Sequence, residues 1–294
     1  MSRLMELVRE HALFSGLQNA GTIAAKQAVL DAMTPDVMQQ LQPCDICHHM
    51  AAVYTKTVAD YVRSPHQRDI IDELVPFMEM LSNGALVLDV GCGSGRDTFF
   101  MSVADRKFRF DLMGRKRHGK TTREKYAVPE KVFDVIGIDA SEGMLEQAKD
   151  KCHELEAGGL LDHCKSSPFF LYSDMHAFTD ELLYDFDGVW SCTALFTHTL
   201  YGLLEKAMRS VKEALNSKGV FFVSYINGRG DKYDHLRIST TGEVKYFSQP
   251  DPDEITELAG KFGLVLVQEE FNDHEVDGKV VRKDLFVSQF FRKE

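Results

Sequence analysis

Apolar and polar positions alternate along the chain with two different periods, and this pattern predicts the order of its elements. Short apolar runs typical of strands lie at residues 85–90, 133–138, 168–172, 186–191 and 219–226. Stretches with helical spacing separate these runs, at about 96–104, 142–156, 175–183 and 200–216. Because apolar strands that alternate with helices are typical of a parallel sheet buried on both faces, we expect an α/β, doubly wound fold.

The two ends of the chain depart from this alternation. Residues up to about 43 have helical spacing, with Thr34 and Pro35 typical of a helix start, and further helices are expected at about 49–61 and 67–81. After a helix at about 251–262, two apolar strands flank the turn-like residues 276–279 and predict an antiparallel hairpin. We therefore expect a mostly parallel, seven-stranded sheet with this C-terminal hairpin in a domain at 49–294, preceded by a helical extension at 1–48.

The first apolar strand ends in Asp89 and is followed by glycines at alternate positions, Gly91, Gly93 and Gly95. Glycine lets a turn pass very close to a ligand. A dinucleotide-binding turn has the spacing G-x-G-x-x-G, but here its third glycine would fall at Arg96, and Asp89 would repel a phosphate. The loop therefore favours a nucleoside that carries a cationic amino-acid tail, with an NAD-linked oxidoreductase as the alternative.

The segment Leu-Asp-Val-Gly-Cys-Gly-Ser-Gly-Arg-Asp at 88–97 resembles the cofactor loop of class I S-adenosylmethionine-dependent methyltransferases. It is most similar to a bacterial-type subgroup whose loop contains Gly-Cys-Gly-Ser-Gly-Arg-Asp. Similar motifs follow in order at 133–144, 169–178 and 186–198, with an aromatic-x-x-Thr helix at 54–57 and a Tyr-Phe element at 246–247. The resemblance covers about residues 50–294 and implies the Rossmann-like methyltransferase fold, with S-adenosyl-L-methionine as cofactor.

The resemblance also implies roles for single residues. Asp89 is expected to assist at the amino-acid end of the cofactor, Asp139 to hold the ribose and Asp174 to accept a hydrogen bond from adenine. The residues alone leave other interpretations open, because either of the last two acids could cap the following helix and Tyr54 could simply pack. For the helix at 142, Ser141 is the better cap. The expected cofactor-binding residues are Tyr54, Thr57, Asp89, Gly91, Cys92, Gly93, Gly95, Arg96, Asp139, Ala140, Ser141, Met144, Asp174, Met175, Ser191 and Cys192.

The acceptor side of the site is marked less clearly. His66, His176 and His198 are candidate general bases, since histidine titrates near neutrality. His198 is preferred because it follows the fourth strand. A purely structural role is the alternative. The fourth strand lacks the Asn/Asp-Pro-Pro-Tyr and Pro-Cys elements of nucleic-acid methylating enzymes, which favours an oxygen, nitrogen or sulfur nucleophile of a small molecule. Candidate residues of the substrate pocket are His66, Tyr225, Arg229 and Tyr246.

Charge is distributed unevenly along the 294 residues, whose formal net charge is −11. A basic insertion at about 105–130 carries nine Lys or Arg residues and only two acidic ones between Arg106 and Lys125. It is interpreted as a solvated surface or as a docking patch, so a methyltransferase acting on RNA or protein remains an alternative. A second alternative is a regulatory module that binds the cofactor without catalysis.

Cysteine content and hydropathy bear on location and metal binding. Six cysteines are too few for a disulfide framework in a chain of this length. No apolar run approaches the roughly 18 residues of a membrane span, and the N-terminus does not resemble a secretory signal. We therefore expect a cytoplasmic protein without a membrane partner. Cys44 and Cys47 have a spacing familiar from zinc sites. Because the sequence contains no second Cys-x-x-Cys, we interpret them as packed cysteines at a helix start and expect no metal.

Overall fold

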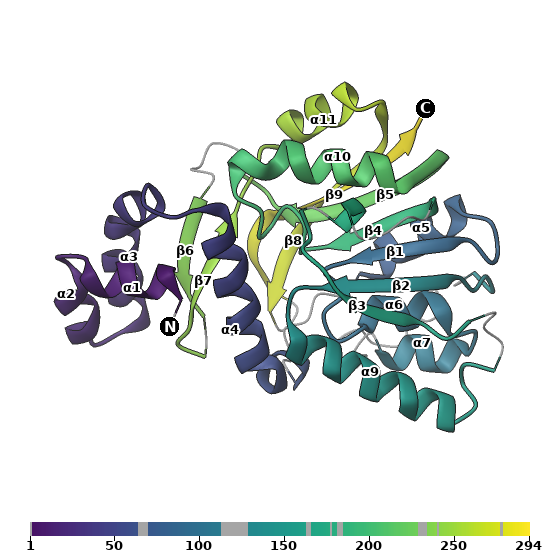
Figure 1. Cartoon of the computed structure of the whole chain (residues 1–294), viewed down its shortest axis with the longest axis horizontal. Coiled ribbons are helices and arrows are strands. Elements are labelled where there is room, and N and C mark those ends of the chain that lie inside the picture. Colours follow the sequence, from purple (N-terminus) through teal and green to yellow (C-terminus); the bar gives the residue numbers. More distant parts are fainter. Residues whose placement is uncertain are drawn as a thin grey trace.

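A mostly parallel sheet forms the centre of the molecule in the computed structural model (Figure 1). The model describes residues 2–63, 70–112, 129–162, 166–176, 178–180, 185–228, 234–239, 241–276 and 279–294. Within them the sheet has seven strands in the order β3-β2-β1-β4-β5-β9-β8, which confirms the predicted fold class. The strands are β1 (Leu86–Val90), β2 (Asp134–Asp139), β3 (Phe169–Tyr172), β4 (Phe186–Cys192), β5 (Leu215–Ile226), β8 (Leu264–Val276) and β9 (Lys279–Lys293).

The pairing of the strands places their carboxyl ends at one edge. β1 pairs in parallel with β2 and β4, with Val90 opposite Ile138, while β3 and β5 extend the sheet on either side. The chain moves outward from β1 in both directions, so the space between the ends of β1 and β4 is the position at which α/β sheets bind ligands. β9 runs antiparallel between β5 and β8 and closes the sheet with the predicted hairpin, whose turn residues 277–278 lie outside the described residues.

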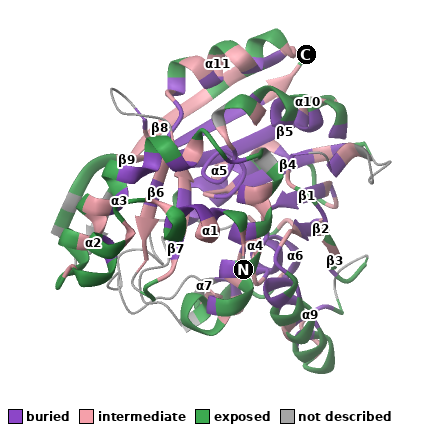
Figure 2. Cartoon of the chain, turned by 60° about the vertical axis from the view of Figure 1, so that its left-hand side comes forward, coloured by how far each residue is buried: buried purple, intermediate pink, exposed green. Residues whose placement is uncertain are grey.

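Helices cover both faces of the sheet, because its central strands are apolar on both sides. One face packs against α5 (Ile71–Met80) and α6 (Arg96–Ser102), with Phe77, Trp190 and Phe222 in the shared core. The opposite face packs against α10 (Leu204–Ala214) and α11 (Pro252–Lys261). α9 (Glu142–Ala157) and α7 (Arg106–Leu112) lie further along the first face. Figure 2 shows β4 and β5 buried between these layers, whereas α9 and α11 present exposed outer surfaces.

The N-terminal helices form a second core with a hairpin from the other half of the chain. These elements are α1 (Arg3–Glu10), α2 (Phe14–Asn19), α3 (Ile23–Met38), α4 (Pro43–Arg63), β6 (Asp234–Ile238) and β7 (Val244–Ser248). Leu4, Leu30 and Met33 pack there with Leu236 and Tyr246, and Figure 1 shows the helices and the hairpin side by side. The predicted boundary of the helical extension, between residues 48 and 49, falls within the continuous helix α4.

The predicted helix start at Thr34 and Pro35 is wrong, because both residues lie inside α3. The hydroxyl of Thr34 donates to the carbonyl of Leu30 at 2.8 Å, as it does in a continuous helix. Proline removes one backbone hydrogen bond from a helix interior. Leu30, Met33 and Val37 are nevertheless all buried on one face of α3, and this packing keeps the helix continuous.

Two further predictions of local structure need correction. In place of the helix expected at 175–183, the described residues form only the short 3₁₀ turn Phe178–Asp180. The sequence pattern predicts no strand between residue 226 and the helix at about 251, whereas β6 and β7 form there and pair in antiparallel register. The side-chain amide of Gln27 bonds to the backbone of Leu236 and Ile238, so α3 supplies partners for the open edge of β6.

Candidate functional site

The loop between β1 and α6 passes close to neighbouring segments and adopts backbone angles that favour glycine. Gly91 has a φ of +75°, and a Cβ built there would lie 2.2 Å from the Cβ of Ala194. Gly93 has a φ of +55°, but a Cβ built there would meet no heavy atom within 4 Å. The backbone at Gly91 therefore packs against the loop after β4, whereas the backbone at Gly93 borders open space that a ligand can fill.

Asp139, the last residue of β2, fixes the glycine loop from the side. Its Oδ2 accepts a hydrogen bond from the backbone N–H of Gly93 at 2.9 Å, and its Oδ1 accepts one from Ser141 at 2.8 Å. Ser141 caps α9, as expected from its position, by accepting from the N–H of Met144. Burial raises the pKa of Asp139 above its ordinary value in spite of these backbone hydrogen bonds.

A pocket lies at the carboxyl edge of the sheet, between these loops and α4. The space between these segments is about 670 Å³ with its open mouth included. Of the predicted residues, Tyr54, Gly91, Gly93, Asp139, Ala140, Ser141, Met144, Asp174, Met175, Cys192 and His198 line it. His176, the less preferred candidate base, also lines it, and the lining residues that were not predicted are Cys47, Met50, Ala51, Tyr61, Thr193 and Ala194.

Asp174 follows β3, and its carboxylate contacts His176, two residues further along the chain. Its Oδ1 accepts a hydrogen bond from the backbone N–H of His176 at 2.8 Å and lies 2.7 Å from Nδ1 of the same residue. The side-chain interaction with His176 holds the pKa of Asp174 low, at about 2. Nδ1 of His176 also lies 3.4 Å from Sγ of Cys47, so this wall of the pocket joins the segment after β3 to α4.

A model of the methyltransferase-domain family matches residues 81–262, more than half of the chain. The chain belongs to this family. It is therefore a class I S-adenosylmethionine-dependent methyltransferase, and S-adenosylmethionine is its cofactor. The site fits this group, because an open pocket adjoins the backbone of Gly93 and a carboxylate stands at the tip of β2.

Several solved structures share the fold of this methyltransferase at low sequence identity. The 1,6-didemethyltoxoflavin-N1-methyltransferase of Burkholderia thailandensis, with 1,6-didemethyltoxoflavin and S-adenosylhomocysteine bound, is 15% identical, with a TM-score of 0.55 over 86% of this chain and 91% of that one. A TehB-like methyltransferase of Corynebacterium glutamicum is 19% identical, with a TM-score of 0.51 over 83% and 100%. The CcbJ methyltransferase of Streptomyces caelestis is 16% identical, with a TM-score of 0.53 over 84% and 97%. At these identities the likeness shows the fold alone.

Two further findings are negative. No curated protein sequence matches the chain. Within the part of the chain that the structure describes, none of the helices combines the length and the apolar character that a membrane crossing requires.

Some residues predicted for the cofactor site of the methyltransferase support the pocket from behind without lining it. Asp89 is buried and accepts a hydrogen bond from the hydroxyl of Thr98 at 2.7 Å, which joins β1 to α6. Burial, and after it the charge of Asp97, raises the pKa of Asp89 well above its ordinary value. Nε of Arg96 lies 2.6 Å from Oδ1 of Asp97. The other predicted residues outside the pocket lining are Thr57, Cys92, Gly95 and Ser191.

The predicted acceptor residues fall into different places. Tyr225 is buried in the sheet core, where its hydroxyl donates to Gln289 at 2.7 Å, so it does not line the pocket. Tyr246 is also buried, and its hydroxyl donates to Asp234 within the hairpin. Its contribution to the site is made by its backbone carbonyl, which binds His198. His66 and Arg229 lie outside the described residues.

The residues that the sequence analysis missed come mainly from the N-terminal half of α4 and from the turn after β4. Cys47, Met50, Ala51 and Tyr54 recur at helical spacing, so the presence of Tyr54 in the site could have indicated the others on the same face. Thr193 has a φ of +51°, a conformation that few residues other than glycine adopt, and the apolar strand gave no signal for it.

Proposed function

We propose that the methyltransferase transfers a methyl group from S-adenosylmethionine to an oxygen, nitrogen or sulfur nucleophile of a small-molecule acceptor. The observation that carries this proposal is the position of α4 over the carboxyl edge of the sheet. The helix contributes Met50, Ala51, Tyr54 and Tyr61 to the pocket wall. A pocket covered by a helix suits a compact acceptor better than a folded polymer.

Contacts on both sides hold α4 in this position. Toward the sheet, Thr55 Oγ1 lies 2.9 Å from Oγ of Ser141, at the start of α9. Toward the hairpin, Nε2 of His49 donates to the carbonyl of Val244 at 2.7 Å. Both contacts are at least partly buried, so they are shielded from competition by water. The cover therefore belongs to the folded structure and narrows access to the pocket.

We assign the cofactor contacts to the acids at the strand ends. Asp139, which lines the pocket at the tip of β2, is proposed to accept hydrogen bonds from the ribose hydroxyls. Asp174, which lines it after β3, is proposed to accept one from the adenine amino group. Asp89 is proposed to support the loop at the amino-acid end of the cofactor from its buried position.

The chain has a modest chemical task. When bound, S-adenosylmethionine supplies an already activated methyl group, so the protein chiefly has to align the acceptor and exclude water. We propose that His198 assists as a proton acceptor. Its Nδ1 donates to the carbonyl of Tyr246, so Nε2 carries no hydrogen in the neutral ring. Burial lowers the pKa of His198 to about 4. A base this weak accepts a proton readily only after methyl transfer has made the acceptor acidic.

An RNA or protein acceptor, docked through the basic insertion, is the alternative for the same chemistry. Within the described part of that insertion, Arg109 is buried and donates to the carbonyls of Pro129 and Lys131, both at 2.6 Å. This guanidinium therefore stabilises the fold and does not face a partner. Residues 113–128 lie outside the described residues. We further propose a reducing, cytoplasmic location, because the described cysteines are all free.

Calorimetry with S-adenosylhomocysteine, followed by transfer of labelled methyl groups into a fractionated cell extract, tests the proposal. We expect one molecule of S-adenosylhomocysteine to bind per chain and the label to enter low-mass compounds. Label in RNA, with binding that weakens steeply as salt rises, would assign a polymer acceptor instead. Binding without transfer to any fraction would indicate a regulatory module. If S-adenosylhomocysteine does not bind, the proposed function is wrong.

A further inference from the structure

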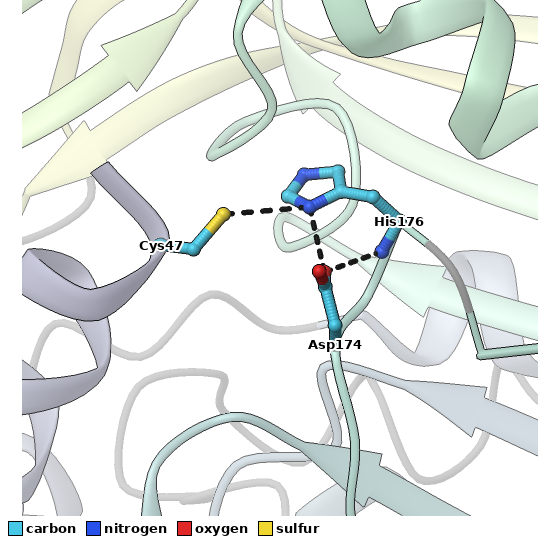
Figure 3. A group of neighbouring side chains, drawn as sticks. All are labelled: Cys47, Asp174 and His176. Atoms are coloured by element: carbon cyan, nitrogen blue, oxygen red, sulfur yellow. Dashed lines mark hydrogen bonds and ion pairs between the residues drawn. The ribbon is translucent and has the colours of Figure 1, made fainter. Parts of the chain in front are cut away.

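Three side chains with metal-binding atoms converge at one wall of the pocket (Figure 3). Sγ of Cys47, on α4, lies 3.4 Å from Nδ1 of His176, and Oδ1 of Asp174 lies 2.7 Å from the same nitrogen. The potential ligand atoms of the three residues all lie within 4.8 Å of one another. Figure 3 shows the thiol and the carboxylate both directed at that one ring nitrogen.

The hydrogen bonds of His176 indicate which ring nitrogen carries the proton. Nε2 lies 2.7 Å from the hydroxyl oxygen of Thr199, and this hydroxyl itself donates to the carbonyl of Leu195. Because a hydroxyl has one hydrogen, Thr199 must accept from His176, so Nε2 carries the proton. In the neutral ring Nδ1 is then a lone pair that faces a carboxylate oxygen. Two lone pairs at 2.7 Å would repel each other, so this contact needs a positive charge, which either a second proton on the ring, donated to Asp174, or a metal ion beside both atoms supplies.

The arrangement does not fit a cysteine nucleophile activated by histidine and oriented by aspartate. In such a triad the nucleophile and the acid contact different nitrogens of the imidazole. Here both contact Nδ1.

We propose that Cys47, Asp174 and His176 bind a zinc ion. Thiolate, imidazole and carboxylate together are typical zinc ligands, whereas magnesium and calcium prefer oxygen alone. Three protein ligands leave a fourth position for water or for a molecule in the pocket. The Nε2–H of His176 binds Thr199, and a second hydrogen bond of this kind commonly orients a metal-binding histidine.

Two of the three separations between ligand atoms agree with a tetrahedral site after a small movement, and the third, between Cys47 and Asp174, is within 4.8 Å. Ordinary zinc bond lengths place a sulfur and a nitrogen ligand about 3.5 Å apart, close to the 3.4 Å between Cys47 and His176. The nitrogen and oxygen ligands should be about 3.3 Å apart, so Asp174 must withdraw by roughly 0.6 Å from its present position. Its side chain is 54% exposed and has room to move, whereas that of His176 is 2% exposed and stays fixed.

The proposed ion would join two parts of the pocket that are distant in sequence. Cys47 lies on α4, and the other two ligands follow β3, so zinc would fasten the covering helix to the sheet edge. Oδ1 of Asp174 makes both contacts with His176, and no described residue bonds to its Oδ2. The carboxylate can therefore bind zinc through one oxygen and an amino group in the pocket through the other. This proposal departs from the sequence-based expectation of no metal.

Titration of the chelator-treated full chain with Co²⁺, followed by Zn²⁺, tests the site without any cofactor present. We expect one Co²⁺ per chain, a thiolate-to-cobalt charge-transfer band in the near ultraviolet, and loss of that band when Zn²⁺ is added. Cys47→Ser should abolish the band and lower affinity by more than about 100-fold, because loss even of outer residues lowers metal affinity 10–100-fold. Cys44→Ser is the matched control, since Cys44 is exposed near the start of the same helix.

A second measurement separates metal binding from misfolding. Zn²⁺ should raise the melting temperature of the wild type and of Cys44→Ser, but not of Cys47→Ser or His176→Gln, whose circular dichroism should match the wild type. The proposal is overturned if the wild type binds no Co²⁺ or if Cys47→Ser retains the charge-transfer band. It is also overturned if Cys44→Ser loses the band, because the thiolate ligand would then be Cys44. Mg²⁺ should not displace Co²⁺.

Discussion

The hydroxyl of Tyr54 lies 3.0 Å from Nε2 of His198, which joins α4 to the loop after β4 inside the pocket. Nδ1 of the same ring donates to the carbonyl of Tyr246 at 3.1 Å, so the imidazole is held in one tautomer, with Nε2 as acceptor. Nζ of Lys245 lies 4.2 Å from the centre of the Tyr54 ring, so a cation already faces this aromatic ring. A neutral histidine between two tyrosines is therefore a defining feature of this site.

The low pKa of His198 has a consequence for stability in acid. Because the folded pKa of about 4 lies below the unfolded value near 6.5, the unfolded chain binds a proton in this range that the folded chain does not. The contribution to stability is complete above pH 6.5 and is lost as the pH falls to 4, by up to about 3 kcal/mol. His198→Asn removes this dependence.

Urea unfolding of the wild type and of His198→Asn at pH 7, 5.5 and 4 measures the effect. We expect the difference between their free energies of unfolding to shrink by about 3 kcal/mol from pH 7 to pH 4. His153→Asn is the control, because His153 is exposed on α9 and its replacement should leave the pH profile unchanged. A difference that stays constant across this range contradicts the buried, neutral state of His198.

Replacement of Gly91 by alanine should disturb the cofactor loop by crowding as well as by backbone strain. The new Cβ would lie 2.2 Å from that of Ala194, whereas at Gly242, with a similar φ of +81°, it would meet nothing within 4 Å. We expect Gly242→Ala to lower the free energy of unfolding by about 1–2 kcal/mol, and Gly91→Ala to lower it by clearly more. Thermal unfolding compares the two variants. Equal losses would show that the loop relaxes to accept the methyl group.

Loss of the Asp139 carboxylate should weaken cofactor binding. Asp139→Ala removes the proposed acceptor for the ribose and also the observed hydrogen bond that positions Gly93. Since one hydrogen bond to a charged group contributes about 1.5–3 kcal/mol, we expect the affinity for S-adenosylhomocysteine to fall by about 10- to 100-fold in calorimetry. Asp134→Ala, at the other end of β2, should bind normally. Unchanged affinity in Asp139→Ala would remove this residue from the site.

Arg109 should stabilise the fold more than the other described cations of the basic insertion. Arg109→Met leaves the carbonyls of Pro129 and Lys131 without the guanidinium that binds both, so we expect a loss of about 2–4 kcal/mol in the free energy of unfolding. Lys107→Met is the control, because Lys107 pairs with Asp111 at the surface and should contribute less than about 1 kcal/mol. Equal effects in urea unfolding would contradict the buried role of Arg109.

The parts of the fold that the sequence predicts well are those with local causes. The strand before Gly91 and the cap at Ser141 depend on residues only a few positions away, and both are found where the pattern places them. The local preference of Pro35 for a helix start is outweighed by packing of the buried face of α3, so the helix continues through it. The residues that are close to Pro35 in the sequence give no sign of this packing.

The rest of the site depends on pairs of residues that are distant along the chain. Cys47 and His176 are 129 positions apart, and neither carries a local signal that it faces the other. The hairpin that carries Tyr246 has its edge partner, Gln27, more than 200 positions away. Tyr225 was predicted in the substrate pocket because the loop after its strand borders that pocket in the family. Its own position in an apolar strand predicts burial instead, and the side chain is buried. Such relations become visible only when the sheet and the N-terminal helices are placed together (Figure 1).

The helix α4 lies wholly before residue 81, where the match to the family model begins. A fragment trimmed to that match would keep the glycine loop and Asp139 but would lose the helix that covers the pocket, and it would also lack β8 and β9 at one side of the sheet. We therefore expect the matched segment to supply the methyl-donor half of the enzyme and the flanking sequence to govern discrimination among acceptors. Screens for the natural substrate should accordingly use all 294 residues.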